Sequence, residues 1–542
     1  MTESTSKNNE VHIMKEFIKN PYYHGMKSGM TLKQCDMIAR RFNYPLETKE
    51  RVWMAAHTVM KSIESRGDIY TPLDEYLART QEILRPEGSS FSISSKMIVS
   101  MLGNDFEIIR LHGRQVVYRK SLEDIERRVA FNIKRLAYSD GVENYNAGLL
   151  SYVEKKCGIK LGVQQRNAVA TILRRRGVKI LTGGPGTGKT TIEKAIITAY
   201  KKMHPEHTIR LCAPTGRAAQ KMGEATGEYS ETIHRLIGYK SKDRITYNRR
   251  NPIPADLIIV DEVSMVDIEL MDHLLDALKT GTLLVLVGDI DQLESVGPGA
   301  VLRDIVFSDV HYLKKICLTE VFRQKEGSPI IENAVKINKG DINLIENEAF
   351  QIIHTKSKEQ TISATLSIGQ SLYNYQNPFE TQILCPAYSG VSGIDTINAH
   401  MQSFIQGKDC NSFLVNDKVM FNKNNYLKEY YNGDIGIIKE TAGDMIRISM
   451  RGTEIVIDKN NIGDIQLAYG MTIHKSQGSE FQNVIIVMPM EPANMLVRNL
   501  FYTGVTRAKS RVIIINEGSA METAIKTDKS GERKTFLRQL II

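Results

Sequence analysis

Hydrophobic residues change their spacing along the chain near residue 159. Before this point they recur at helical intervals, as in Arg51–Ile63 and Leu122–Tyr138. After it, short apolar runs alternate with helical stretches, which predicts strands at residues 179–181, 208–213, 257–260 and 283–287. Because strands that alternate with helices are typical of a doubly wound parallel sheet, we expect a mostly helical N-terminal part followed by α/β structure.

A second α/β stretch is interrupted by a segment of short strands. Strand and helix patterns run from about Ile330 to Ser403 and resume from about Ile465 to Asn516. Between them, residues 411–463 contain closely spaced turn signals at Asn432–Asp434, Ala442–Asp444 and Arg451–Gly452. Short strands at regular spacing predict a small β-barrel inserted into the second α/β unit.

Three local patterns stand out in the N-terminal part. Residues 21–42 fit a helix–turn–helix or part of a helix-hairpin-helix. Residues 107–118 predict a hairpin that turns at His112-Gly113, and Tyr70–Leu84 predicts a helix capped by Thr71. Helices followed by a hairpin suggest a winged-helix-like unit, for which DNA contact and a purely structural role are both open.

Net charge and cysteine spacing indicate which kind of partner the chain binds and in which compartment it works. The chain of 542 residues is too long for one core, and its formal net charge of +9 favours a polyanionic partner, although basic surfaces without one are common. The six cysteines form no CxxC pair, and Cys212, Cys317 and Cys385 lie in apolar runs, so we expect buried thiols in a reducing compartment. The sequence shows neither a signal core nor an apolar run of membrane-spanning length, so we expect a cytoplasmic protein.

The sequence ILTGGPGTGKTT at residues 180–191 is the strongest single signal. A strand, a glycine-rich loop and a helix match the P-loop pattern G-x-x-x-x-G-K-[ST]. Glycines let backbone N–H groups wrap a phosphate chain, and the helix N-terminus adds its positive dipole end. Lys189 is expected at the β- and γ-phosphates and the Thr190 hydroxyl at Mg²⁺. The expected nucleotide contacts are Gly183, Gly184, Pro185, Gly186, Thr187, Gly188, Lys189, Thr190 and Thr191.

Two further strands end in polar residues that suit phosphate hydrolysis. Asp261 and Glu262 follow the strand at 257–260, and active-site residues sit at the carboxyl ends of parallel strands. Asp261 would hold Mg²⁺, and Glu262 would orient or deprotonate the attacking water. Gln292, after the strand at 283–287, would bond the γ-phosphate or water and so sense it; alone, this segment would be an ordinary strand-to-helix loop.

Arginines and small polar residues complete the candidates. Arg323 and Arg507 follow apolar runs and would neutralise charge on the γ-phosphate, although each in isolation is typical of a surface arginine. APTGRAA at 213–219, TIH at 232–234 and YGMTIHKSQGSE at 469–480 have few carboxylates and suit contacts to a nucleic-acid strand. A hydrolase or a zinc site at His474 is disfavoured, because no nucleophile elbow or ligand cluster accompanies it.

Taken in this order, the segments resemble the motif series of superfamily 1 helicases, most closely the RecD-like branch, superfamily 1B. LGVQQRNAV resembles the Q-motif, GGPGTGKT motif I, APTGRAA with TIHRLIG motifs Ia and Ib, VDEVSM motif II and GDIDQLESVGPG motif III. VFRQ resembles motif IV, MTIHKSQGSEF motif V and YTGVTRAK motif VI. The resemblance covers roughly residues 158–540, and NPYYHGMKSGMTLKQCDMIARRF is similar to the helix-hairpin-helix stretch of longer RecD-like helicases.

The resemblance implies a role for each matching residue. Gln165 would contact adenine, Arg323 and Arg507 would be arginine fingers, and Gly478 and Glu480 would join the nucleotide site. Catalysis would rest on Lys189, Glu262, Gln292, Arg323 and Arg507, with Thr190 and Asp261 holding Mg²⁺. DNA would be contacted by Pro214, Thr215, Gly216, Arg217, Thr232, His234, Thr472, His474, Lys475 and Ser476.

The resemblance also implies a division into domains. A helical N-terminal domain, helix-hairpin-helix or winged-helix-like, would span residues 1–157. RecA-like domain 1A would span 158–329, with a short 1B pin at 238–254. RecA-like domain 2A would comprise 330–410 and 464–542, and an SH3-like 2B insertion would occupy 411–463.

The activity that the resemblance implies is an ATP-dependent DNA helicase that moves 5′→3′ on single-stranded DNA and unwinds duplex. ATP and Mg²⁺ would be its cofactors, and single-stranded and tailed duplex DNA its partners, with a single-strand-binding, recombination or replication protein beside it. We expect a monomer without membrane contact. A DNA-stimulated ATPase that remodels protein–DNA complexes without processive unwinding is one alternative, and a binding module with a structural ATP switch is another. An RNA track, and the choice between replication, recombination and repair, stay open.

Overall fold

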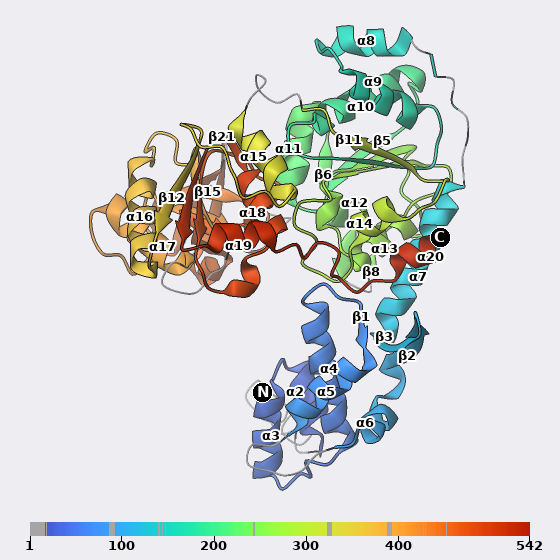
Figure 1. The fold of residues 1–542 in the computed structure, drawn as a ribbon, viewed down its shortest axis with the longest axis vertical. Helices are drawn as coiled ribbons and strands as arrows, with labels where there is room; N and C mark the ends of the chain where they lie inside the picture. The colour runs from blue at the N-terminus through green and yellow to red at the C-terminus, as the bar shows by residue number, and fades with distance from the viewer. Residues whose placement is uncertain are drawn as a thin grey trace, which may run out of the picture.

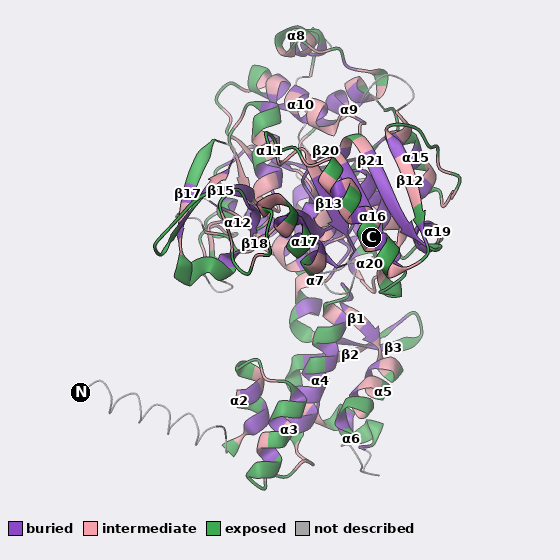
Figure 2. Cartoon of the chain, turned by 90° about the vertical axis from the view of Figure 1, so that its left-hand side faces the viewer, coloured by how far each residue is buried: buried purple, intermediate pink, exposed green. Residues whose placement is uncertain are grey.

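The computed structural model describes residues 17–542 except 18, 86–92, 139–140, 142, 144, 147, 242–243, 322–327, 387–392, 426–427, 429 and 451. Two units, each built on a parallel sheet, lie side by side, and the N-terminal elements form a separate body beneath them (Figure 1). Strands such as β20 and β21 are buried, whereas the helices around them expose their outer faces (Figure 2). The α/β architecture with parallel sheets agrees with the prediction.

The first parallel sheet has the strand order β11-β4-β10-β9-β5-β6. Central strands β4 and β10 are apolar along most of their length and fully buried, as expected for strands covered on both faces. All four predicted strands are present. The strands are β4 (Val178–Gly183), β5 (Ile209–Ala213), β6 (Ser230–Thr232), β9 (Leu257–Val260), β10 (Leu283–Gly288) and β11 (Lys314–Leu318).

Helices cover both faces of this sheet. They are α8 (Gly148–Cys157), α9 (Val163–Leu173), α10 (Lys189–Met203), α11 (Gly216–Thr226), α12 (Ile233–Leu236), α13 (Ile268–Asp276) and α14 (Val301–Phe307). A short antiparallel pair lies in the segment expected to form a pin: β7 (Tyr239–Ser241) and β8 (Arg244–Ile245).

The second parallel sheet has the order β12-β21-β20-β13-β19. Its strands are β12 (Phe350–Thr355), β13 (Thr381–Cys385), β19 (Gly470–Thr472), β20 (Phe481–Met488) and β21 (Ala508–Glu517). Its helices are α15 (Pro329–Asn338), α16 (Lys358–Ser371), α17 (Ile394–Gln406), α18 (Arg498–Val505) and α19 (Ala520–Lys526).

An antiparallel sheet interrupts the second unit, where short strands were predicted. Its order is β17-β16-β15-β14-β18. The sheet extends beyond the expected boundary at residue 463. Its last strand, β18, lies after that boundary and pairs with β14. The strands are β14 (Lys418–Phe421), β15 (Ile435–Ala442), β16 (Met445–Met450), β17 (Thr453–Asp458) and β18 (Ile465–Leu467).

The described residues of the N-terminal body form five α-helices and a three-stranded sheet of order β1-β3-β2. The hairpin β2–β3 turns at His112-Gly113 as predicted, with φ values of 45° and 82°. The helix predicted from Tyr70 begins instead at Leu73, because Tyr70–Pro72 forms strand β1 against β3 and Thr71 is buried there. The elements are α2 (Pro21–Lys27), α3 (Leu32–Arg41), α4 (Lys49–Glu64), β1 (Tyr70–Pro72), α5 (Leu73–Leu84), α6 (Ser95–Met101), β2 (Phe106–Leu111) and β3 (Arg114–Arg119).

Two helices from distant parts of the chain pack into the core of the first unit. Helices α7 (Lys120–Ala137) and α20 (Leu537–Ile541) contact each other and share one buried apolar cluster with β4 and β9. The expected division placed residues 120–137 in the N-terminal domain and 537–541 in the second RecA-like domain. Their apolar faces are buried against the first sheet instead, so packing assigns both helices to the first unit.

Cysteine burial follows strand position. Cys212 and Cys385 are buried as expected, but Cys317 is exposed, because β11 lies at the edge of its sheet. Among the described residues, no helix combines the length and apolar character that crossing a bilayer requires.

Candidate active site

The P-loop lies between buried strand β4 and helix α10. Gly186 and Gly188 have φ values of 75° and 80°, a left-handed conformation that favours glycine. A Cβ at Gly188 would lie 2.2 Å from the Gln165 side-chain nitrogen, so a side chain at this position would have to displace Gln165. No side chain caps the start of α10. The helix therefore presents its N-terminal N–H groups toward the loop, as an anion site requires.

Lys189 bonds to the loop itself. Its Nζ donates to the carbonyl oxygens of Gly183 (2.6 Å) and Gly184 (3.2 Å). Thr187 Oγ1 also donates to the Gly184 carbonyl, at 2.9 Å. The ammonium group is thus held beside the loop in a position to exchange these carbonyls for phosphate oxygens.

Carboxylates collect at the carboxyl end of β9. Asp261 Oδ1 accepts from the Glu262 backbone N–H at 2.7 Å, and Glu262 has a positive φ of 51°. Such strain in a residue other than glycine is typical of functional sites. Burial and the Glu262 charge raise the pKa of Asp261. Burial, and then Asp261, raise the pKa of the fully buried Glu193 of α10, whose two carboxylate oxygens have no hydrogen-bond partner among the described residues.

Residues on both sides of Gln292 connect the two units. Its Nε2 donates to Asp289 Oδ2 at 3.2 Å, and the Tyr502 hydroxyl of α18 donates to the same oxygen at 3.0 Å. The Leu293 N–H, one residue further, donates to Thr503 Oγ1 of α18 at 2.9 Å. The glutamine expected to sense the γ-phosphate is thus bonded, through Asp289, to a helix of the opposite unit.

Arg507 reaches the site from the second unit. It is 3% exposed, and its guanidinium donates to Thr503 O (3.0 Å), Ser479 O (3.2 Å) and Thr506 Oγ1 (3.0 Å). These bonds fix the planar group at the end of α18 without neutralising its charge, so the charge remains available to a phosphate. The other expected finger, Arg323, lies outside the described residues.

One cavity of about 330 Å³, which we call the nucleotide cavity, brings most of these residues together. Four of the expected residues that the structure describes do not line it. Gln165 bonds instead to the Gly162 N–H and Thr187 carbonyl, and Gly478 packs against Ala218 of α11. Gly183 and Thr187 are buried, and Thr187 Oγ1 donates to the Gly184 carbonyl instead of reaching the cavity. The lining residues are Gly184, Pro185, Gly186, Gly188, Lys189, Thr190, Thr191, Lys221, Asp261, Glu262, Gln292, Glu480, Thr506 and Arg507.

Sequence reasoning missed two of the lining residues, Lys221 and Thr506. Lys221 of α11 pairs with Glu480 of the second unit at 3.0 Å, so it adds a cation and a contact between the units. A lysine on an amphipathic helix carries no local signal of such a role. Thr506 precedes Arg507, and its position next to a predicted finger was the available clue.

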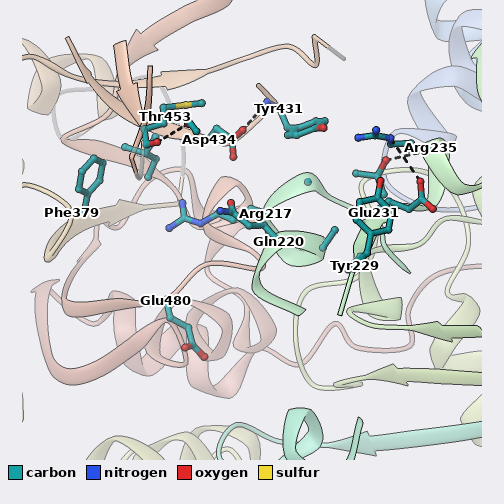
Figure 3. Close-up of a pocket in the computed structure, with 16 residues that line it drawn as sticks. Arg217, Gln220, Tyr229, Glu231, Arg235, Phe379, Tyr431, Asp434, Thr453 and Glu480 are labelled. Atoms are coloured by element: carbon teal, nitrogen blue, oxygen red, sulfur yellow. Dashed lines mark hydrogen bonds and ion pairs between the residues drawn. The ribbon is translucent and has the colours of Figure 1, made fainter. Parts of the chain in front are cut away.

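Three of the residues expected to contact DNA line a second hollow, of about 400 Å³. Gly216, Arg217 and Thr232 come from the first unit, and Tyr431, Asp434 and Thr453 face them from the antiparallel sheet and the loop before β15 (Figure 3). Tyr431 covers Gly216 so closely that a Cβ there would lie 2.5 Å from its ring. Thr215 and Thr232 cap α11 and α12, and His234 contacts the Tyr239 ring.

Three more of the residues expected to contact DNA, Thr472, His474 and Lys475, line a third hollow of about 1230 Å³. Its walls also include Arg66, residues 293–296 and Arg533. Lys475 Nζ donates to Asn422 Oδ1 at 2.7 Å, and burial lowers the pKa of His474. Ser476 is buried and its hydroxyl donates to Ile473 O, so this side chain faces the interior.

Two family models match the two units separately. One described as "AAA domain" matches residues 160–362, and one described as "UvrD-like helicase C-terminal domain" matches residues 467–515. Among solved structures, the Pif1 helicase from Bacteroides in complex with ADP-AlF3 and ssDNA is 19% identical, with a TM-score of 0.44 over 68% of this chain and 94% of that chain.

Curated relatives extend across both units. The ATP-dependent RecD2 DNA helicase of Deinococcus radiodurans is 32% identical over 72% of this chain, and the match spans about half of that relative (53%). The RecBCD enzyme subunit RecD of Mycolicibacterium smegmatis is 31% identical over 70% of this chain and 75% of that relative. With two parallel-sheet units around one P-loop cavity and these relatives, the chain belongs to the RecD-like family of superfamily 1B helicases.

Proposed function

We propose that the chain is an ATP-dependent DNA helicase that moves 5′→3′ on single-stranded DNA and unwinds duplex. The observation that carries this proposal is the nucleotide cavity, which Lys189, Asp261, Glu262 and Gln292 line from the first unit and Arg507 lines from the second. A nucleotide held between two units can change their separation when it is hydrolysed. The direction follows from family membership.

The side chains supply the steps of hydrolysis. Lys189 would leave the carbonyls of Gly183 and Gly184 to bind the β- and γ-phosphates, while loop N–H groups hold the chain of phosphates. Glu262 would accept a proton from the attacking water. Arg507 would neutralise the charge that develops on the γ-phosphate, and Gln292 would sense its departure.

The oxygen ligands in the nucleotide cavity fit Mg²⁺. Thr190 and Asp261 both line the cavity, and hydroxyl and carboxylate oxygens are the ligands this cation prefers. The neighbouring Glu193 has two buried carboxyl oxygens with no hydrogen-bond partner among the described residues, so the site has oxygen atoms that a hydrated divalent cation would satisfy. Bound there with ATP, Mg²⁺ would neutralise phosphate charge.

DNA would follow the second and third hollows. Arg217 and Thr232 on one path, and Thr472, His474 and Lys475 on the other, offer hydroxyl, imidazole and cationic donors for a backbone. In this proposal the antiparallel sheet is the SH3-like 2B insertion and the β7–β8 pair is a short 1B pin. The N-terminal body is the helix-hairpin-helix or winged-helix-like domain.

The cellular setting is also part of the proposal. Relatives named as subunits of RecBCD favour a role in DNA recombination and repair. A single-strand-binding or recombination protein as partner, a monomeric state and a cytoplasmic location remain predictions.

Lys189→Ala tests the nucleotide site. We expect loss of ATP hydrolysis by about 100-fold or more, because a pre-positioned charge at the phosphates is removed. Lys202→Ala, an exposed lysine near the far end of the same helix, is the control and should keep wild-type turnover. Wild-type hydrolysis by the Lys189 variant would refute the assignment of the site.

Tailed duplexes separate the proposal from its main alternative, a DNA-stimulated ATPase that does not unwind. Duplexes with a 5′ tail, a 3′ tail and no tail are compared under the same conditions. Unwinding only from the 5′ tail is expected. ATP hydrolysis without unwinding of any substrate would favour the alternative, and unwinding only from the 3′ tail would reverse the direction.

A further inference from the structure

Residues 527–542, which we call the strap, connect the two parallel-sheet units. On the second unit, the Arg498 backbone N–H donates to Thr527 O at 2.9 Å, and its guanidinium pairs with Asp528 at 2.7 Å. At the other end, Leu537 and Ile541 are buried in the core of the first unit. Figure 1 shows the strap as the red trace that runs from α19 to α20. The strap therefore spans the boundary between the units that bind the nucleotide.

The strap also holds the N-terminal body. The Ile69 N–H donates to Lys534 O, and the Lys534 N–H donates to Asp68 Oδ1, both at 2.9 Å. Lys534 Nζ pairs with Glu75 of α5 at 2.9 Å. Three parts of the molecule thus meet at the middle of this one segment.

Arg533 binds the loop of residues 294–299, which follows Gln292. Its Nε pairs with Glu294 at 2.7 Å, and its Nη1 donates to Ser295 Oγ at 3.0 Å and to Gly299 O at 2.6 Å. The side chain is 15% exposed. Because a guanidinium presents five donors in a fixed plane, a single arginine can hold several points of one loop together.

The 294–299 loop is bonded at both ends. The Leu293 N–H bonds to Thr503, and the Leu293 carbonyl accepts from Gln477 Nε2 at 3.1 Å, so the second unit holds its start. The Gly299 N–H donates to Gly67 O at 2.9 Å, so the N-terminal body holds its end. A Cβ at Gly67 would lie 2.2 Å from Arg533 Nε, which shows how closely the three segments pack.

Arg533 also faces the hollow that we assign to DNA. It lines the third hollow together with Thr472, His474 and Lys475. The loop that it holds begins two residues after Gln292, which lines the nucleotide cavity. The Arg533 side chain therefore forms part of the wall of the proposed DNA path and also contacts the 294–299 loop, which lies next to the nucleotide cavity.

We propose that Arg533 is a positioning residue that couples DNA in the third hollow to Gln292 through the 294–299 loop. This inference rests on the proposed function of the two sites. Arg533 touches neither ATP nor the reacting water in this scheme. It fixes the loop, so that a shift of the hollow's wall on DNA binding changes the position of Gln292. If Arg533 only stabilised the fold, its loss would lower hydrolysis with and without DNA in equal proportion.

Arg533→Gln, with Arg533→Lys and Arg538→Gln for comparison, tests the coupling in the full chain. Arg538 is an exposed arginine of α20, so its variant removes the same charge from the strap without touching the loop. The ATPase rate is measured without DNA and with saturating oligo(dT), alongside the unfolding midpoint. For Arg533→Gln, we expect the ratio of stimulated to unstimulated rate to fall about tenfold, with a smaller change in the unstimulated rate. Lysine should restore the ratio in part, through the ion pair with Glu294.

Two outcomes would overturn the inference. One is a wild-type ratio in a folded Arg533→Gln variant, and the other is an equal fall of both rates with a lowered unfolding midpoint. If Arg533→Gln does not fold, Glu294→Gln keeps the carbonyl bonds and removes only the ion pair; a wild-type ratio there would also contradict the proposal. Absence of DNA stimulation in the wild-type chain would instead refute the proposed function.

Discussion

The two parallel-sheet units contribute to one cavity, but they are built differently. The second unit assembles its core from residues between 330 and 525, apart from Leu293. The first unit takes α7 from the N-terminal side and α20 from beyond the second unit, and buries both against its own sheet. The unit with the P-loop is thus anchored to distant segments. The unit with Arg507 meets it through polar contacts, the Leu293 side chain and the strap, so we expect nucleotide-driven motion to occur at that boundary.

Arg507→Ala should separate the chemical roles of the two units most strongly. We expect ATP hydrolysis to fall about 10³-fold, because in the proposed function Arg507 is the arginine that stabilises the transition state. Binding of a fluorescent ATP analogue should persist, since the P-loop is intact, whereas Lys189→Ala should lose both properties. Arg511→Ala, on the same segment but bonded to Gln351, is the control. Near-normal hydrolysis by Arg507→Ala would place the charge for the γ-phosphate elsewhere.

Leu537→Ala should weaken the first unit alone. The side chain is 1% exposed in that unit's core, so we expect a loss of about 2–5 kcal/mol in its free energy of unfolding. Hydrogen exchange should accelerate in β4 and β10 more than in β20 and β21. Ile525→Ala in α19 is the matched variant for the second unit and should show the reverse. Equal acceleration in both sheets after either change would mean that the units unfold together.

Glu126 should make the folding stability of the first unit depend on pH. Its Oε1 accepts from the N–H groups of Phe536 and Leu537, at 2.8 and 3.0 Å. Burial raises its pKa from an ordinary 4.5 to about 8, so the folded chain keeps a proton that the unfolded chain loses. Stability should therefore fall as pH rises through this interval, since the unfolded state then binds fewer protons than the folded state.

Glu126→Gln should remove that contribution, because an amide keeps the acceptor and does not ionise. Unfolding midpoints are measured between pH 5 and 8, a range that lies between the ordinary and the raised pKa of Glu126. As the pH rises, the midpoint should fall less steeply in this variant than in the wild type. Asp124→Asn, an exposed neighbour on α7, should leave the wild-type slope unchanged. A slope unaffected by the Glu126 change would show that other groups cause it.

The parts of this molecule that local sequence predicts are those that local chemistry determines. The P-loop glycines and the apolar strands that precede Lys189, Asp261 and Gln292 each lie within a few residues of the group they position. Contacts between distant segments are not marked by any local pattern in the sequence. Glu126 and Phe536 are 410 positions apart, and nothing near either one indicates that they bond.

Two individual errors have the same origin. Thr71 has the residue type of a helix cap, but pairing with β3 takes its segment into a sheet. Cys317 lies in an apolar strand, but the strand's place at the sheet edge, set by five other strands, leaves it exposed. In both cases tertiary contacts override a local preference.

The place of α20 has a consequence for how the chain is made. Synthesis delivers residues 178–318, which contain every strand of the first sheet, long before residues 537–541. Domains generally fold as they emerge, starting from the N-terminal side. Here the core of the first unit stays open on one side until the second unit and the strap have been translated. The apolar face of α7 is also incompletely covered until α20 has been made, because the two helices pack together. Of the two parallel-sheet units, the P-loop unit is therefore the first to begin folding and the last to complete its core.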